Sequence, residues 1–242
     1  MPRRAVFPVT AAALWCVMIV ILALTATDVY SQTKEDAALN QVLKQMEGVG
    51  KTFHSFKAHI SKKHYTAVLK EFDTPETGEF YYERAKDGSA LLRQEISSPG
   101  PSILTIKGGI AMFYQPVLKQ AQIYNLGKNK DKAEYLALGL GQSPGKLQET
   151  FDLKYQGTET VAGFPCSVLV LKPKNPSAAA YASSITLWIK KSTGVPIQQK
   201  LQEPSGGDYL FVSFTDEKLN IQIPPSKFVQ KLPSGVEIQK IQ

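Results

Sequence analysis

Residues 78–84 read Gly-Glu-Phe-Tyr-Tyr-Glu-Arg, and this stretch decides the fold class of the chain. Successive side chains of a β-strand point to opposite faces, so Phe80, Tyr82 and Arg84 would share one face of a strand. The turn sequence Lys86-Asp87-Gly88 follows and bounds it. The stretch therefore predicts a strand with one apolar face that ends in an arginine.

The same two-residue period continues on both sides of this strand. Turn sequences such as Ser98-Pro99-Gly100 and Gly108-Gly109 separate the strands at short, regular intervals, which is typical of an antiparallel meander. The predicted strands cover residues 55–65, 78–84, 91–96, 103–107, 110–114, 122–126, 151–156, 166–172, 185–190, 197–201, 209–214 and 236–241. Residues 173–182 are rich in small and polar side chains and predict a loop.

Two helical patterns interrupt the strands. The first covers residues 36–47 and is expected to stop at Gly48 and Gly50. The second covers residues 131–140, and Ser143-Pro144 can start a further short turn of helix toward Thr150. The predicted fold class is mainly β with a few helices, in which one antiparallel sheet wraps around those helices.

Several predicted strands carry large apolar side chains on alternate positions. These are Phe80, Tyr82, Leu92, Ile96, Ile110, Met112, Ile185, Leu187, Ile189, Ile197 and Leu201. On the stripes alone an ordinary sealed core is the simpler interpretation, because apolar strand faces are usually packed. A sheet with so many apolar side chains and so few helices can also leave part of its concave face uncovered as a cavity.

The N-terminus predicts export. Arg3 and Arg4 precede an uncharged apolar run, and Val29-Tyr30-Ser31 suits a signal peptidase, so residues 1–31 are predicted to be a cleavable signal peptide. The alternative is an uncleaved anchor, since the uncharged stretch 5–27 is long enough to span a bilayer. Residues 32–242 then form a single predicted domain.

The two cysteines predict no lipid anchor and no disulfide. Bulky Trp15 precedes Cys16 where lipid attachment requires a small residue, so acylation of Cys16 is not expected. Cys166 is the one cysteine after the predicted signal, and its apolar neighbours indicate a buried small hydrophobic residue.

Charge and motifs exclude several function classes. The chain has 28 basic and 21 acidic residues, and the excess is scattered, so a nucleic-acid-binding patch is not expected. Residues 48–52 resemble the end of a phosphate-binding loop but follow a predicted helix rather than a strand. His54, His59 and His64 are spaced by five residues without a nearby cluster of cysteines or carboxylates, so no metal site is predicted. We find no catalytic motif and expect neither an enzyme nor a cofactor.

Several stretches together resemble the family of the periplasmic lipoprotein carrier LolA. They are the first helix leading through Val49 to Phe56, residues 78–84, Pro99 through Ser102-Ile103-Leu104, Gly108, Phe113-Tyr114-Gln115-Pro116 with Gln120-Ala121, Ser226-Lys227-Phe228, and Pro233 to Val236. The run from Pro99 through Gln120-Ala121 is the closest match and the most specific. The resemblance runs from about Leu39 to Ile238 and is loose in the middle.

This resemblance implies an unclosed antiparallel β half-barrel with a helical lid. Such a carrier takes acylated lipoproteins through the periplasm from an inner-membrane releasing transporter to an outer-membrane receptor. In the family a strand arginine latches the closed lid by bonding helix carbonyls, and Arg84 occupies the matching position; a plain ion pair with a neighbouring carboxylate is the alternative. Ala85 replaces the proline that usually follows, and residues 86–90 lengthen the hairpin, so the resemblance does not fix the lid geometry at this point.

The expected function is therefore a monomeric lipid carrier that binds acyl chains against the apolar strand positions named above. Its lid helices would present Leu39, Val42, Leu43, Met46, Leu136 and Leu140. Two rivals remain: an envelope sensor or structural domain that binds a protein partner without lipid, and an enzyme acting on lipid or glycan.

Overall fold

The computed structural model describes residues 34–127 and 137–241. The chain divides into two compact units, residues 1–41 and 42–242, and the described part of the first, residues 34–41, is helical. The predicted signal peptide lies outside the described residues, as does most of the predicted helix 131–140. Within the described ranges no helix has the length and apolar character needed to cross a bilayer.

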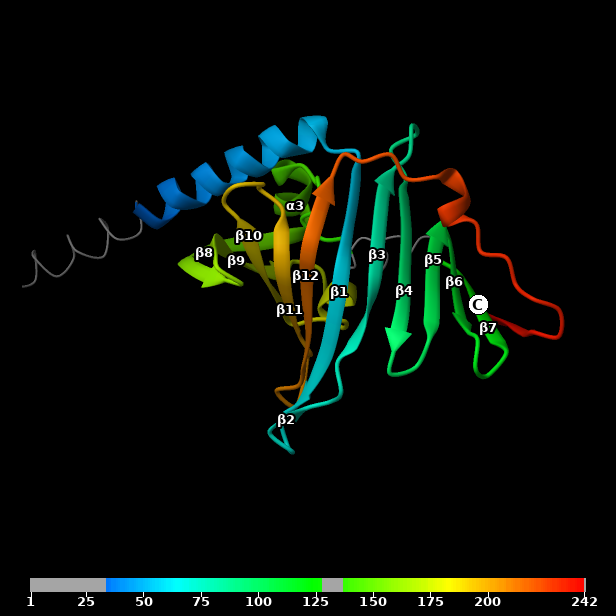
Figure 1. Cartoon of the computed structure of the whole chain (residues 1–242). Coiled ribbons are helices and arrows are strands. Elements are labelled where there is room, and N and C mark those ends of the chain that lie inside the picture. Colours follow the sequence, from blue (N-terminus) through cyan, green and yellow to red (C-terminus); the bar gives the residue numbers. More distant parts are fainter. Residues whose placement is uncertain (1–33, 128–136, 242) are drawn as a thin grey trace, which may run out of the picture. The chain divides into compact units, whose positions relative to one another are not determined.

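In the second unit, 13 strands formed by the described residues join one sheet (Figure 1). The strands are β1 (Ser55–Thr66), β2 (Glu71–Phe72), β3 (Glu76–Arg84), β4 (Ala90–Ser98), β5 (Ser102–Lys107), β6 (Ile110–Gln115), β7 (Gln120–Asn125), β8 (Phe151–Val161), β9 (Phe164–Pro173), β10 (Ser184–Lys190), β11 (Pro196–Gln202), β12 (Tyr209–Leu219) and β13 (Glu237–Ile241). Their spatial order is β13-β7-β6-β5-β4-β3-β1-β12-β11-β10-β9-β8, and β2 pairs with β1.

The sheet is unclosed, because its two edge strands, β13 and β8, stand at opposite ends of that order. Neighbouring strands pair antiparallel except β13, which runs parallel to β7. The predicted fold class, an open antiparallel half-barrel of the LolA type, is confirmed. All twelve predicted strands are present, and the two-residue strand β2 was not predicted.

The helices differ in places from the predictions. The first helix covers residues 34–52 and continues through Gly48 and Gly50 instead of stopping there. The N–H of Phe53 still donates to the carbonyl of Val49 at 2.9 Å, because a glycine inside a helix costs only about 1 kcal/mol and need not end it.

The short helix after Ser143 is confirmed as α3 (Pro144–Thr150), with the Ser143 side chain accepting a hydrogen bond from the N–H of Lys146. Residues 137–140, the described end of the predicted second lid helix, form a turn rather than a helix. Two further elements were not predicted: helix α4 (Pro176–Ala179), inside the predicted loop, and the 3-10 helix η1 (Pro225–Phe228).

Strand register places the core on the inner face of the sheet. Tyr82 of β3 lies opposite both Phe56 of β1 and Leu92 of β4, and Leu92 lies opposite Ile106 of β5. Residues directly opposite one another in a ladder share a face. These four side chains are buried in one hydrophobic cluster that also includes Leu140 of the segment after β7.

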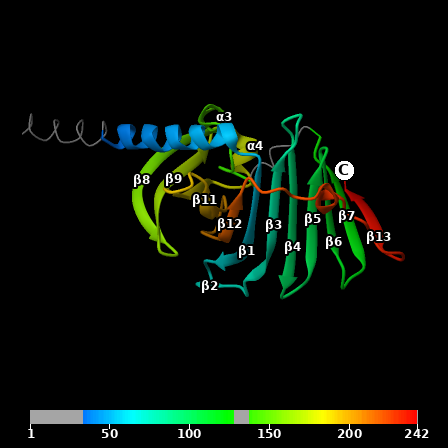
Figure 2. The same ribbon diagram turned by 45° about the horizontal axis from the view of Figure 1, so that its top comes forward.

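The C-terminal segment covers part of the other face. Lys227 of η1 bonds both carboxylate oxygens of Glu95, at 3.0 and 2.8 Å, and Arg93 bonds Glu95 and Gln230. Phe228 is fully buried. Figure 2 shows this segment passing over β3 to β5 before the chain reaches β13.

Candidate functional site

Arg84 lies at the end of β3, where it joins two separate segments of the chain. Its Nη1 donates to the carbonyl of Gly50 in the first helix at 3.1 Å, and its Nη2 donates to the carbonyl of Gly141. The guanidinium also lies 5.9 Å from the centre of the Phe53 ring. Both acceptors are backbone carbonyls, so the charge of the arginine adds strength to these bonds without requiring a carboxylate.

Residues 137–142, which we call the closing segment, lie tightly on the inner face. Gly139 and Gly141 both have left-handed backbone, with φ of 80° and 63°. A Cβ on Gly141 would lie 2.2 Å from the Phe53 ring, and one on Gly139 would lie 3.1 Å from Leu187. Gln199 donates to the carbonyl of Leu138 at 3.1 Å. The segment can pack this closely because it has glycine at both contact points.

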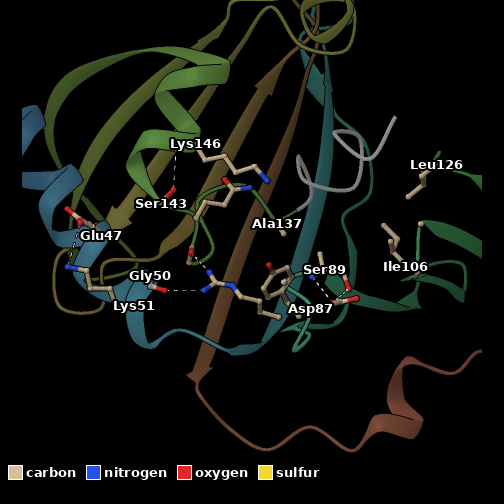
Figure 3. A pocket seen from close by; sticks show the side chains of 18 residues that line it. Glu47, Gly50, Lys51, Asp87, Ser89, Ile106, Leu126, Ala137, Ser143 and Lys146 are labelled. Carbon is tan, nitrogen blue, oxygen red and sulfur yellow. Dashed lines mark hydrogen bonds and ion pairs between the residues drawn. The ribbon is translucent and has the colours of Figure 1, made fainter. Parts of the chain in front are cut away.

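A cavity of about 890 Å³ lies beside Arg84 and the closing segment. Its apolar wall consists of Tyr82, Ala90, Ile106, Leu126 and Ala137. Its polar rim includes Glu47, Lys51, Asp87, Ser89, Ser143 and Lys146. In Figure 3, Ile106 and Leu126 lie on one side of this space and Ser143 and Lys146 on the other. The volume is within the range of about 300 to 1,000 Å³ that is usual for small-molecule pockets.

Most of the strand residues predicted to line a cavity do share the inner face. The same face can be followed across the sheet from β3 through β1 and β12 to β11. There Leu201 lies opposite Ile185 of β10, and Ile185 lies opposite Leu171 of β9. The predicted residues on this face are Phe80, Tyr82, Leu92, Ile96, Ile185, Leu187, Ile189, Ile197 and Leu201. Of these, Tyr82 borders the 890 Å³ cavity, and all the others except half-buried Leu201 are buried.

Two predicted cavity residues lie on the wrong face. Met112 pairs with Thr105, which pairs with Arg93, so Ile110 and Met112 lie on the outer face. Ile110 is 39% exposed. The inner positions of β6 are Ala111 and Phe113 instead. The alternation of β6 is apolar on both faces, so the sequence alone could not show which set points inward.

The predicted lid residues have mixed placements. Val42, Leu43 and Met46 are buried, and so is Leu140. Leu39 belongs to the first unit, where it is half-buried, and Leu136 lies outside the described residues.

Sequence reasoning missed most of the cavity wall. Leu104 and Ile106 alternate on the predicted strand 103–107, and this alternation indicates an apolar face that includes Ile106. Leu126 and Ala137 border the same cavity as Arg84, but only long-range packing brings them there, and no local pattern shows it.

Cys166 is fully buried, as predicted, and burial raises the pKa of its thiol. The three histidines do not converge. However, His64 lies beside Glu203 and Asp208, with ligand atoms within 4.8 Å of one another, a cluster that joins two hairpins distant in sequence. His64 Nε2 is already 2.8 Å from Glu203, and an N–H at Ala67 donates to Asp208 at 2.8 Å.

The chain matches no protein-family model and no curated protein sequence. Solved structures do match it. An uncharacterised conserved protein from Thermus thermophilus is 12% identical, with 84% of this chain and 99% of that chain aligned at a TM-score of 0.53. MucB is 18% identical at a TM-score of 0.50, over 84% of this chain and 65% of MucB.

The solved structures also include LolA superfamily protein NE2245 from Nitrosomonas europaea. It is 12% identical over 79% of this chain and 97% of its own, and its TM-score of 0.37 carries no argument by itself. At these identities a structural match shows the fold alone. The chain therefore has an open β half-barrel fold of the LolA type.

Proposed function

We propose that the chain is a periplasmic carrier that binds the acyl chains of lipoproteins and delivers them toward the outer membrane. The observation that carries this proposal is the cavity beside Arg84, which has an apolar wall and a polar rim. An inner-membrane releasing transporter and an outer-membrane receptor are its proposed partners. The proposed carrier acts as a monomer, without a cofactor and without catalysing a reaction.

The lining of the cavity suits an amphiphile. Hydrocarbon can lie against Tyr82, Ile106 and Leu126, while the polar linkage of a lipid stays near Ser143 and Lys146 on the rim. Burial of acyl chain is worth about 0.8 kcal/mol per methylene, so ten to fifteen methylenes give roughly 8 to 12 kcal/mol before the cost of ordering the ligand. Such a carrier retains its ligand in water and still releases it to a better acceptor.

Arg84 is proposed to hold the empty cavity closed. Its two bonds connect β3 to the helix carbonyl of Gly50 and to the closing segment at Gly141. When these bonds break, the closing segment can move off the inner face and expose Phe53, Leu140 and the strand residues beneath them. The predicted latch thus acts on one helix and on a turn, rather than on two helices.

A lipopeptide assay tests the carrier function directly. The protein purified without detergent is mixed with a triacylated lipopeptide or with the same peptide lacking acyl chains, and bound ligand is measured by native mass spectrometry. We expect binding of the acylated form alone. Equal binding of both peptides would favour a partner-binding module, and no binding of the acylated peptide would refute the carrier.

The latch is tested separately with an apolar fluorescent probe. Arg84→Leu removes both bonds, so we expect the probe to bind faster and the protein to retain more lipid. Lys86→Leu is the matched control, because it removes a nearby positive charge from an exposed position in the same hairpin. If Arg84→Leu and Lys86→Leu behave alike while lipopeptide still binds, the latch is wrong and the carrier function stands.

A further inference from the structure

Two turns of the second unit share the residues Val-Leu-Lys and a backbone conformation. Residues 67–70 read Ala-Val-Leu-Lys, and residues 116–119 read Pro-Val-Leu-Lys. In each turn the lysine N–H donates to the carbonyl of the first residue at 3.2 Å, so valine and leucine are the central residues. Lys70 and Lys119 both have left-handed backbone, with φ of 57° and 50°.

The side chains at these turns are unusual for their positions. Val68 is 87% exposed and Leu69 64%, while Val117 is 76% exposed and Leu118 58%. Glycine, proline, asparagine, aspartate and serine dominate tight turns, and glycine is the usual residue with left-handed backbone. Both turns instead expose two aliphatic side chains and place a lysine where the backbone is strained.

Both turns lie at the same end of the sheet. Antiparallel ladders connect them from strand to strand through the partners Tyr65 and Phe72, Lys62 and Glu76, Thr77 and Ser98, Ile96 and Ser102, Ile103 and Tyr114, and Gln115 and Gln120. Figures 1 and 2 show the turn at β2 and the turn between β6 and β7 at the lower end of the strands. The turns on the cavity rim, at Asp87 and at Gly108, lie at the opposite end of these strands.

Aromatic and basic side chains lie directly behind the first turn. The rings of Tyr65, Phe72 and Tyr209 lie 4.8 to 5.8 Å apart, centre to centre. The Lys63 ammonium lies 4.0 Å from the centre of the Phe72 ring, and Lys200 lies 4.2 Å from that of Tyr209. Amphipathic rings and lysines with long apolar stems are the side chains that proteins place at a membrane interface.

We propose that these two turns are a membrane-contact site for a phospholipid bilayer with anionic headgroups. Each turn places its Val-Leu pair at the boundary with the acyl chains, and its lysine at the level of the phosphates. A protein partner fits less well, since a stable interface needs about 800 Å² from each side and these are small protruding tips. Glu71 follows the first turn, and the N–H of Glu237 donates to the carbonyl of Lys119 in the second, so the attraction comes from the aliphatic side chains together with the lysines.

This proposal does not rest on the acyl cavity. The contact site lies at the other end of the strands, and it would act whether the cavity takes a lipid or another ligand. It is tested on the chain as isolated from cells, so that parent and variants share the same N-terminus.

The depth of each turn is measured by tryptophan fluorescence with vesicles of phosphatidylethanolamine and phosphatidylglycerol that carry brominated acyl chains. The variants are Leu69→Trp and Leu118→Trp. The control is Ile110→Trp, since Ile110 is also exposed and stands at the opposite end of the strand that leads into the second turn. We expect quenching beyond that of the parent at positions 69 and 118, and none beyond it at position 110.

Binding is measured with the same vesicles by co-sedimentation. The double variants Val68→Ser with Leu69→Ser, and Val117→Ser with Leu118→Ser, should each weaken partitioning about tenfold, and Ile110→Ser should not. Replacing phosphatidylglycerol by a zwitterionic lipid should also weaken binding, because the lysines lose their counter-charge. Circular dichroism should show all variants folded, since each change is at an exposed position.

The outcomes decide the proposal. If position 69 or position 118 shows no quenching beyond that of the parent, the paired site is overturned. Serine double variants that partition onto vesicles like the parent also overturn it. Quenching that is equal at all three positions indicates nonspecific adsorption and also overturns it. If the serine variants bind vesicles like the parent but no longer bind an envelope protein that the parent binds, the turns would be assigned to a protein partner instead.

Discussion

The two halves of the inner face carry similar apolar side chains but are covered differently. Over β9 and β10, Leu169, Leu171, Ile185 and Leu187 are fully buried, and Gly139 of the closing segment lies close against Leu187. Over β3 to β5, Phe80 and Leu92 are buried too, but Tyr82, Ala90 and Ile106 border the 890 Å³ cavity. The difference teaches that alternation places side chains on a face, while the segments that cross the face decide whether they form a core or a cavity wall.

The largest expected effect is a difference in the free energy of unfolding between two truncations, one in each half of the inner face. Leu187→Ala removes fully packed atoms and should lower the free energy of unfolding by about 3 to 5 kcal/mol. Leu126→Ala enlarges a space that is already open and should cost less, about 2 kcal/mol. Urea unfolding of both variants measures the difference. Equal losses would mean that the two halves are equally well packed.

Gly141→Ala should disturb the junction between the halves. The new Cβ would overlap the Phe53 ring and occupy a left-handed backbone position, so we expect a loss of about 2 kcal/mol and faster uptake of an apolar probe. Gly145→Ala is the control, because α3 leaves open space at that position and helical alanine is favourable. A neutral Gly141→Ala would show that the closing segment is not tightly held.

Filling the cavity should affect ligand binding more than stability. Ala90 lies opposite Arg84 and lines the cavity, so Ala90→Leu should weaken binding of an apolar probe about tenfold. Ala180→Leu is at an exposed position and should leave binding unchanged. Unchanged binding in Ala90→Leu would place the ligand elsewhere.

The smallest expected effect concerns the outer face. Burial acts to raise the pKa of Glu95, but hydrogen bonds from Lys227 and Arg93 lower it below its ordinary value. A carboxylate with a lowered folded pKa stabilises the protein above its ordinary pKa, and this stability is lost as the pH falls through the lowered value.

Lys227→Ala should therefore cost up to about 1 kcal/mol at pH 7. The difference between this variant and the parent should shrink as the pH falls through the lowered pKa of Glu95, because the protonated carboxyl no longer attracts Lys227. Urea unfolding at a series of pH values measures this. A difference that stays constant down to about pH 2 would mean that Lys227 acts through packing and not through charge.

Much of the fold could be predicted from the sequence, because strands and turns depend on local patterns. The twelve predicted strands and the capped helix after Ser143 are local features of this kind. The inward face of β6 could not be predicted, since Ile110 and Met112 are as apolar as Ala111 and Phe113. The predicted end of the first helix at Gly48 and Gly50 was also wrong. The helix continues through Gly50, whose carbonyl accepts a hydrogen bond from Arg84.

The candidate site was less predictable than the fold. Arg84 was singled out through a family resemblance, whereas its acceptor Gly141 follows residues 131–140, whose pattern predicts a helix although residues 137–140 form a turn. The wall residues Leu126 and Ala137 meet Tyr82 only after the sheet has formed, so no spacing along the chain could reveal them.

The parallel pairing of β13 with β7 has a consequence for the order of assembly. Glu237 stands opposite Gln120, 117 residues earlier in the chain, and every strand from β8 to β12 is made between them. Contacts between such distant residues form slowly, so this ladder is expected to be completed late. A late, solvent-exposed edge is also where amide protons exchange first, which makes β13 the expected starting point for unravelling of the sheet.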